Sequence, residues 1–316
     1  MTSEQSNRIS VIDPISPAIE RVKVMLFRPF DFGRWFIIGF CAWLAYLGNG
    51  GGGGGGGGGS NWSGPQGPHE HQAEIAEALN TTKEYLLANL FWIIPTGVII
   101  IAAVICLGLV IAWINSRGKF MFLHCVAENK SEVKVPWHKF SAHGNSLFLF
   151  RVVLGLASLA IMILPISGII FFAIMISAHV VPHATSIPGI ILCVLIILVV
   201  AIALTLVRKF TFDFVVPIMF LRTASCTAAW REFLTILSVN KARFTLYILF
   251  QIVISIVIGT IIFIGFCIGC CFCCASILLC IPYIGTVILL PIFVFKQAYP
   301  LYYLRQYGPS FNVFGS

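Results

Sequence analysis

Residues 189–207 read GIILCVLIILVVAIALTLV, and the two cations Arg208 and Lys209 follow directly. An α-helix rises about 1.5 Å per residue, so about 20 apolar residues cross a hydrocarbon core about 30 Å thick. The 19-residue stretch is therefore long enough to cross a membrane, and the cations after it suit the headgroup region. This stretch predicts a transmembrane helix, and much of the chain follows the same pattern.

The composition of the whole chain agrees with that prediction. Hydrophobic residues make up 59% of the 316 residues and charged residues only 10%, against about 25% charged residues in an average soluble protein. No charged residue occurs between Arg151 and Arg208 or between Arg243 and Lys296, over 56 and 52 residues. A soluble fold cannot hide so much apolar surface. The composition therefore excludes a soluble enzyme, a nucleic-acid-binding protein, a disordered protein and a small disulfide-rich domain.

These apolar stretches predict an all-α, polytopic helical membrane protein with about six transmembrane helices, arranged as three hairpins. The expected spans cover residues 31–47, 86–114, 147–177, 189–207, 244–266 and 277–295. The first span is the shortest, because its uninterrupted apolar run covers only residues 35–47. It crosses the membrane only if the helix begins near Asp31 and the Arg34 side chain reaches back to the interface. Otherwise this segment is re-entrant or interfacial.

Positive charge lies almost entirely on one side of such a topology. Segments 1–34, 115–147, 208–243 and 296–316, together with Arg151, contain 19 of the 20 lysines and arginines. Positive residues near span ends stay on the cytoplasmic side. We therefore expect a cytoplasmic N-terminal segment 1–34, a membrane domain 35–295 with a glycine-rich external loop 48–85, and a cytoplasmic tail 296–316.

Two of the cytoplasmic segments share sequence features. Lys119-Phe120-Met121-Phe122 matches Lys209-Phe210-Thr211-Phe212 at a distance of 90 residues, and Trp137 matches Trp230 at a distance of 93. The matches indicate either an internal duplication or independent enrichment of Trp, Phe and Lys at the membrane boundary. Residues 16–28 also predict an interfacial helix that lies flat on the inner leaflet, because most of its apolar residues share one arc.

Basic and aromatic residues of the cytoplasmic layer form the candidate site. They are Arg28, Asp31, Arg34, Lys119, Trp137, Arg208, Lys209, Asp213, Trp230 and Arg231. Cations in such a layer attract anionic lipid headgroups and equally suit a cytoplasmic protein partner. Asp31 and Asp213 each lie near two cations, which predicts either ion pairs that fix helix ends or part of a headgroup site.

The sequence contains no clear catalytic or cofactor motif. The ten glycines at 50–59 lack the Lys-Ser/Thr ending of a phosphate-binding loop and predict a flexible linker. The expected spans hold no charged residue at mid-depth, and a hydrogen bond between helices explains the polar Gln251. We therefore predict a protein without catalytic residues or cofactors.

Five of the eleven cysteines fall within residues 267–274. On a continuous helix Cys267, Cys270, Cys271 and Cys274 share one face, because successive residues turn by about 100°. Three interpretations remain open: packing of small apolar side chains, disulfides, or a weak metal site. Packing is favoured, because an apolar setting disfavours the thiolate that a metal requires and four donors on one helix surround an ion poorly.

Several short stretches resemble an uncharacterised family of bacterial multipass integral membrane proteins. They are RPFDFGRW at 28–35, GKFMFL at 118–123, NSLFLFR at 145–151, IPYIGT at 281–286 and QYGP at 306–309. The chain is also distantly similar to the membrane domain of some glycerophosphoryl diester phosphodiesterases, without their catalytic domain. The resemblance implies a bacterial cytoplasmic membrane location and supplies no catalytic residues.

Together these inferences predict a non-enzymatic membrane protein that binds anionic lipid or a partner through its basic, aromatic cytoplasmic face. The alternative is a transporter or channel for an apolar or amphipathic solute, and a membrane-embedded lipid enzyme is a third hypothesis. Membrane lipids are the expected partners. A nucleic-acid partner is not expected, because the pI near 9.0 follows from the segregated cations.

Overall fold

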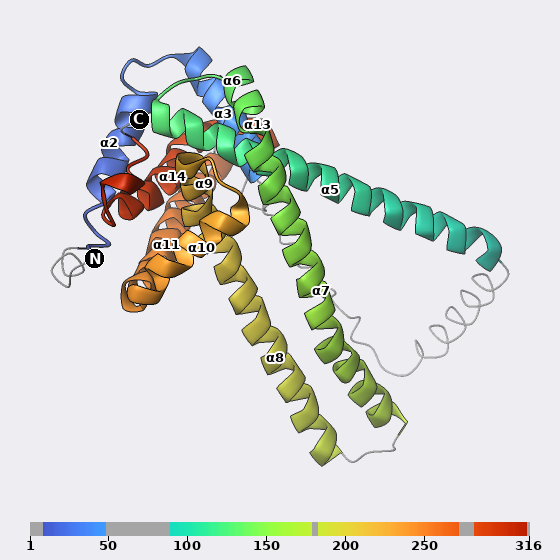
Figure 1. Cartoon of the computed structure of the whole chain (residues 1–316). Coiled ribbons are helices and arrows are strands. Elements are labelled where there is room, and N and C mark those ends of the chain that lie inside the picture. Colours follow the sequence, from blue (N-terminus) through green and yellow to red (C-terminus); the bar gives the residue numbers. More distant parts are fainter. Residues whose placement is uncertain (1–8, 49–88, 179–182, 272–280, 315–316) are drawn as a thin grey trace. The chain divides into compact units, whose positions relative to one another are not determined.

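The computed structural model describes residues 9–48, 89–178, 183–271 and 281–314, and the regular secondary structure in these ranges is helical (Figure 1). In chain order the helices are α2 (Ile15–Leu26), α3 (Phe32–Tyr46), α5 (Leu90–Glu128), α6 (Lys134–Lys139), α7 (Ser141–Ser177), α8 (His183–Phe210), the π-helix η1 (Thr211–Val215), α9 (Val216–Arg222), α10 (Cys226–Val239), α11 (Lys241–Cys271), α13 (Pro282–Ile288), α14 (Leu290–Arg305) and the 3-10 helix η2 (Pro309–Phe311). The expected all-α fold class is confirmed for these residues.

The described residues divide into two compact units. Residues 89–112, which are the first part of α5, form the described part of the smaller unit. Its side chains are almost all exposed, including those of Ile99, Ile101 and Leu107. A helix that is apolar on all sides is typical of a membrane span. The larger unit contains residues 9–48 and 113–314.

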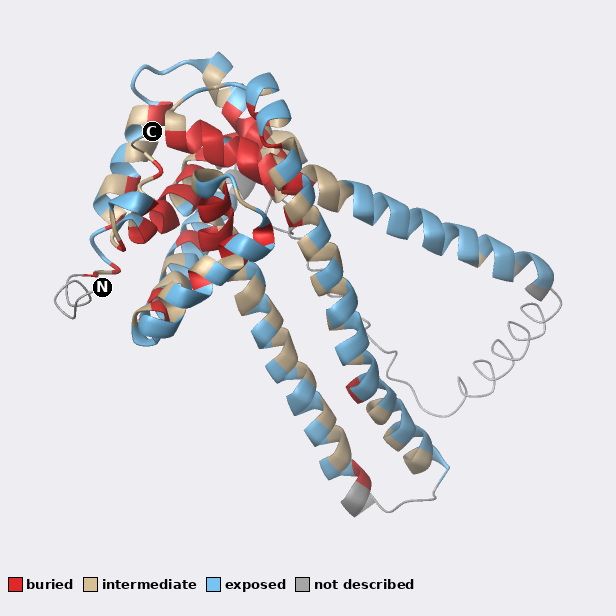
Figure 2. Ribbon diagram, in the orientation of Figure 1, coloured by how far each residue is buried: buried red, intermediate tan, exposed pale blue. Residues whose placement is uncertain are grey.

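Four helical stretches are long and apolar enough to cross a membrane: Ile94–Glu128, Ser141–Ser177, Ser186–Arg222 and Lys241–Ile268. The second and third run side by side as α7 and α8 (Figure 1). Most apolar side chains along α7, α8 and α11 are exposed, and Figure 2 shows these helices mainly in pale blue and tan. Exposed apolar surface of this extent suits contact with lipid chains.

The first and sixth expected spans take a different form. The first corresponds to α3, which is only 15 residues long. The sixth, 277–295, is divided in the described part into α13 and α14, which are separated at Leu289. Many residues of α14 are buried in the larger unit, among them Leu290, Phe293 and Val294, and residues 272–280 lie outside the described ranges. Six spans in three hairpins therefore remain a prediction.

The core of the larger unit lies where the basic parts of the long helices meet. It is built from α3, the second part of α5, η1, α9, α10, α14 and the start of α11. In Figure 2 this core is the concentration of red ribbon. Its large, fully buried aromatic side chains are Phe120, Phe122, Phe214, Phe233, Phe244, Tyr247, Tyr299 and Tyr303. Burying each such ring removes a large apolar area from water, which fixes this end of the helices.

Helix α2 covers part of this core. It corresponds to the interfacial helix expected at 16–28, and its buried residues Ala18, Met25 and Leu26 pack in the core next to α14. Ile19 is 43% exposed, and Glu20 and Lys23 are exposed as well. Part of α2 is therefore held by the protein, while its exposed residues combine an apolar side chain with charged ones, as in a membrane-surface helix.

Candidate functional site

The π-helix η1 joins α8 to α9 and positions the carboxylate of Asp213. Four of its five residues are buried, including Asp213, whereas Arg208 just before it is exposed. A π-turn is wider than an α-turn, shifts the following side chains around the helix axis and occurs often at functional sites. Here the π-helix brings Asp213 into the core.

Asp213 is the acceptor at the centre of a polar network. Its Oδ2 atom lies 2.8 Å from Lys209 Nζ and accepts a hydrogen bond of 2.8 Å from the Tyr247 hydroxyl. Gln251 Nε2 in turn donates to the Tyr247 hydroxyl at 2.9 Å. The network therefore joins η1 and the end of α8 to α11. The ion pair expected of Asp213 is present, while Gln251 bonds within its own helix rather than across helices.

Lys119 lies against the same region from α5. Its residue exposure is only 5%. The ammonium Nζ lies 3.7 Å from the centre of the Tyr46 ring and 4.8 Å from that of Phe212. Cation–π contacts of this kind stabilise a desolvated ammonium group by up to about 2 kcal/mol. Two aromatic faces therefore hold this lysine inside the protein.

Positive charge exceeds negative charge around this lysine. The charged groups that act on Lys119 are Arg151 and Lys209, which repel it, and Asp213, which attracts it. Lys296 of α14 adds a further cation: partial burial lowers its pKa, and the positive charge of Lys209 lowers that pKa further. We call Lys119, Arg151, Lys209 and Asp213 the charged network.

Arg151 of α7 completes the charged network. Its Nη1 atom donates to Asn115 Oδ1 at 2.6 Å and to Ser116 Oγ at 3.2 Å. The guanidinium carbon lies 5.3 Å from the centre of the Phe212 ring. Phe212 is therefore an aromatic contact common to Arg151 and Lys119, and Arg151 fastens α7 to α5.

Asn115 and Gly118 attach α5 to the end of α3. Asn115 Nδ2 lies within hydrogen-bond distance of the carbonyls of Leu44, Ala45 and Leu47, at 3.3, 2.7 and 2.8 Å. These are carbonyls that a helix C-terminus leaves without intrahelical partners. A Cβ atom on Gly118 would lie 2.6 Å from the backbone carbon of Leu44, so only glycine fits this close approach. Tyr46 is thereby held over Lys119.

Trp137 belongs to a separate aromatic contact. The Arg117 guanidinium lies 4.4 Å from the Trp113 ring centre and 5.2 Å from that of Trp137. Asn145 Oδ1 accepts hydrogen bonds from Trp113 Nε1 at 3.0 Å and from Arg117 Nη2 at 3.2 Å. Trp137 therefore packs around Arg117 and is not part of the charged network.

Trp230 packs among aromatic rings, 6.0 Å from Phe150 and 5.6 Å from Phe233 between ring centres. Its indole Nε1 is buried without a hydrogen-bond partner among the described residues. The next residue, Arg231, is exposed, as is Arg208. Trp230 therefore contributes to the core, whereas the two arginines lie on the surface.

Arg28, Asp31 and Arg34 lie at the junction of α2 and α3. Asp31 Oδ1 accepts a hydrogen bond of 2.8 Å from the Gly33 amide and so caps α3. Arg28 lies 3.7 Å from Glu20, and Arg34 Nη2 donates to the Asn129 carbonyl at 3.1 Å. Asp31 is exposed, so it acts as a helix cap and is not brought together with the buried Asp213.

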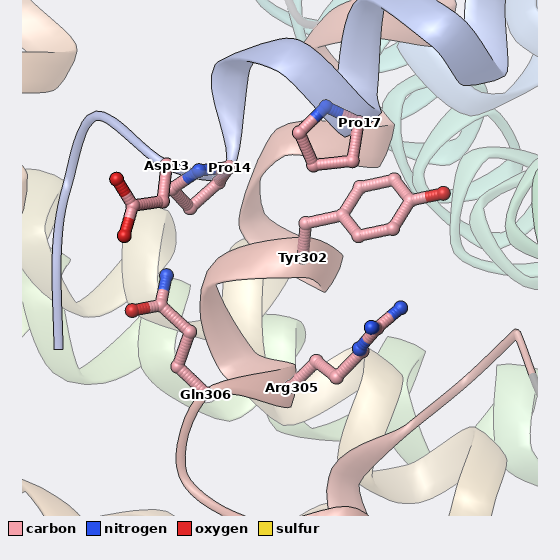
Figure 3. Close-up of a pocket in the computed structure, with 6 residues that line it drawn as sticks. All are labelled: Asp13, Pro14, Pro17, Tyr302, Arg305 and Gln306. Atoms are coloured by element: carbon pink, nitrogen blue, oxygen red, sulfur yellow. The ribbon is translucent and has the colours of Figure 1, made fainter. Parts of the chain in front are cut away.

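A cavity of about 220 Å³ lies at another place in the larger unit (Figure 3). Its lining residues are Asp13, Pro14, Pro17, Tyr302, Arg305 and Gln306. The Gln306 amide pairs with the Ser10 backbone, accepting from its N–H at 2.8 Å and donating to its carbonyl at 2.9 Å. The Tyr299 hydroxyl likewise donates to the Val11 carbonyl at 2.7 Å. These bonds attach the N-terminal segment to α14, and none of the predicted site residues lines this cavity.

The cysteine cluster lies largely outside the described part of the chain. Cys267 is exposed on α11. The side chains of Cys270 and Cys271, and the whole of Cys274, fall outside what the structure describes. Within the described ranges no group of three or more His, Cys, Asp or Glu side chains could hold a metal ion. The interpretation of this cluster therefore stays a prediction.

A model of a family of unknown function, DUF7544, matches residues 9–305. The chain belongs to this family. No curated protein and no solved structure matches the chain. The match agrees with the expected uncharacterised family, but nothing supports a similarity to glycerophosphoryl diester phosphodiesterases or a bacterial source.

The sequence interpretation missed three members of this region: Arg151, Asn115 and Tyr247. One signal was present, because Asp213 is the only acidic residue between Glu132 and Glu232. A lone carboxylate between long apolar stretches indicates a specific partner, since an unpaired one is costly to bury. The partners themselves come from helices distant in sequence, and no local pattern identifies them.

Proposed function

We propose that this family member is a multipass, non-enzymatic membrane protein that binds anionic lipid headgroups at the basic ends of its apolar helices. One observation carries the proposal: exposed apolar surface along each long helix gives way to cations at the end that joins the core. On α8, exposed Leu198 and Ile202 are followed by Arg208, and on α11 exposed Lys241 precedes exposed Leu249. This is the arrangement of a helix whose end lies among headgroups.

The orientation that goes with this proposal places the basic ends in the cytoplasm of a bacterial cell. Nineteen of the 20 lysines and arginines lie on the proposed cytoplasmic side, which agrees with the rule that positive flanking residues stay inside. Reporter fusions after residues 59 and 188 are expected to report the external side, and fusions after residues 130, 224 and 316 the cytoplasm. A cytoplasmic signal after residue 59 would remove α3 from the set of spans.

The lipid preference is tested with nanodiscs that contain phosphatidylcholine and phosphatidylglycerol. We expect phosphatidylglycerol to be enriched around the protein, and replacement of exposed Arg208, Arg231 and Lys241 by Gln to reduce this enrichment. Each cation near a charged surface contributes about 1 kcal/mol, or about fivefold. The matched control exchanges Lys and Arg at the same positions and keeps the charge. Unchanged enrichment in the Gln variant would contradict the proposal, and capture of a protein partner instead would favour a docking function.

A transporter or channel is the second candidate. It is favoured by the charged network itself, because ionisable groups inside apolar helices often mark a solute pathway. Flux of an amphipathic solute into proteoliposomes, lost when Asp213 is replaced by Asn, would support transport over lipid binding alone.

A further inference from the structure

Lys119 is a buried lysine whose ammonium group has no ion-pair partner among the residues that the structure describes. Its ammonium group has three donors, yet it makes no hydrogen bond or ion pair with any residue that the structure describes; its polar contacts are the ring faces of Tyr46 and Phe212. The residue is 5% exposed. An unpaired buried charge destabilises a protein strongly unless a counter-charge is present.

The neighbouring groups do not supply that counter-charge. Asp213 is the negative group acting on Lys119, and its Oδ2 atom is already bonded to Lys209 and to the Tyr247 hydroxyl. Arg151 adds positive charge, and its Nη1 atom donates to the neutral Asn115 and Ser116. The charged network therefore contains three cations and one carboxylate.

We propose that the charged network binds a phosphate group with net negative charge, contacted by Lys119 and flanked by Arg151 and Lys209. Phosphate oxygens accept several hydrogen bonds at once and suit both guanidinium and ammonium donors. The Lys209 side chain is 40% exposed, so the network reaches the surface there. The large exposed apolar side chains of α8 end at Ile202, about two helical turns before Lys209, and the headgroup of a lipid packed along α8 would meet this opening.

This inference rests on the proposed function only for the source of the phosphate. A lipid headgroup and a free phosphate ion share the required chemistry. The proposed function concerns exposed cations on the outer surface, whereas this site lies inside the helix packing. The two can therefore fail separately.

The test measures thermal unfolding and lipid retention of the purified full chain in a neutral detergent. Phosphatidylglycerol, phosphatidylcholine and inorganic phosphate are added separately, and bound lipid is counted by native mass spectrometry. The variant is Lys119→Met, which keeps an unbranched side chain only one heavy atom shorter and removes no hydrogen bond to a described residue. Lys119→Arg is the matched control that keeps the charge. Lys134→Gln, at an exposed lysine of α6, is the surface control, and Arg208→Gln reports on the proposed surface function.

We expect one tightly retained phosphatidylglycerol and a higher unfolding temperature in the unmodified chain and in Lys119→Arg and Lys134→Gln. Lys119→Met should bind at least about tenfold more weakly, as expected for loss of a charge-assisted hydrogen bond. An equal gain from inorganic phosphate supports the site with a free ion as its ligand. Equal binding by Lys119→Met and the unmodified chain overturns the inference, and so does stabilisation by neither anion. If Arg208→Gln alone weakens binding, the interior site is rejected while the proposed surface function stands.

Discussion

Lys119 on α5 and Lys209 on α8 stand in matching Lys-Phe-x-Phe stretches, but the protein treats them differently. Lys209 is 40% exposed and pairs with Asp213, four residues further on. Lys119 is 5% exposed and packs on aromatic rings, and the residue four positions after it is the apolar Leu123. Residues four apart face each other on a helix, so the residue directly after the motif determines whether the lysine has a carboxylate partner.

The residues that precede the two lysines also differ in burial. Before Lys119, Asn115 and Gly118 hold the end of α3. At the matching positions before Lys209 are Thr205 and Arg208, which are exposed. The shared motif therefore determines the helix and its boundary, whereas the flanking residues determine which copy of the lysine is buried. Pairs of matched substitutions can test this.

Asn115→Ala is expected to have the largest effect. It removes the donor shared by three α3 carbonyls and the acceptor of Arg151, and buried groups left unpaired destabilise by about 1–3 kcal/mol each. We expect a loss of about 3 kcal/mol in the free energy of unfolding in mixed micelles. The matched change Thr205→Ala should alter it by less than about 0.5 kcal/mol, as for other surface sites. Equal losses in the two variants would contradict the proposed asymmetry.

Gly118→Ala is expected to rank second. A new Cβ atom would lie 2.6 and 2.8 Å from backbone atoms of Leu44 and Ala45, so α3 must move, and overpacking of this kind destabilises by about 1–3 kcal/mol. We expect a loss of about 2 kcal/mol in the free energy of unfolding in mixed micelles. Arg208→Ala, at the exposed matching position, is the control and should have little effect. A neutral Gly118→Ala would mean that α3 and α5 are not this close.

Lys209→Met and Lys119→Met are expected to change the free energy of unfolding in different directions. The first leaves Asp213 buried with the Tyr247 hydroxyl as its remaining partner. Because the Lys209 side chain is partly exposed, the loss should be about 1–2 kcal/mol, below that of a fully buried pair. The second removes a repelled cation, so without anionic lipid we expect no loss or a small gain. A larger loss for Lys119→Met than for Lys209→Met would reverse the comparison.

The smallest expected effect concerns Lys296. Partial burial lowers the pKa of Lys296, and the positive charge of Lys209 lowers it further. A larger share of Lys296 is therefore a neutral, reactive amine at a given pH. In Lys209→Met this pKa should rise, and the rate of amine labelling at Lys296 should fall at constant pH. Lys241, an exposed lysine on α11, provides the reference rate. Faster labelling of Lys296 in the variant would contradict the assignment of Lys209 as its neighbour.

The long helices could be predicted from sequence because their evidence is local. An uncharged stretch such as 189–207 has few alternatives to a membrane helix. The start of a helix near Asp31 could also be predicted, and Asp31 caps α3 there. The short helices were harder, because nothing local separates a span at 277–295 from the pair α13 and α14, which pack on α3. That outcome depends on neighbours far away in the chain.

The charged network shows why the candidate site was only partly predicted. The sequence predicts Lys119, Lys209 and Asp213 as cations and a carboxylate of a boundary layer, but a pattern of charge at helix ends does not distinguish surface from interior. The burial of Lys119 follows from Tyr46 and Asn115, which belong to contacts between α3 and α5. The π-helix that buries Asp213 has no propensity signal of its own.

The bonds between Ser10 and Gln306, and between Val11 and Tyr299, have a consequence for how the chain is made. A ribosome delivers the first of these partners long before the last, because 296 positions separate Ser10 from Gln306. During most of synthesis Ser10 and Val11 therefore lack these partners, although Arg21 of α2 can already donate to the Val126 and Ala127 carbonyls of α5. A chain broken off before α14 would keep these contacts between α2 and α5 and lose the bonds of Ser10 and Val11.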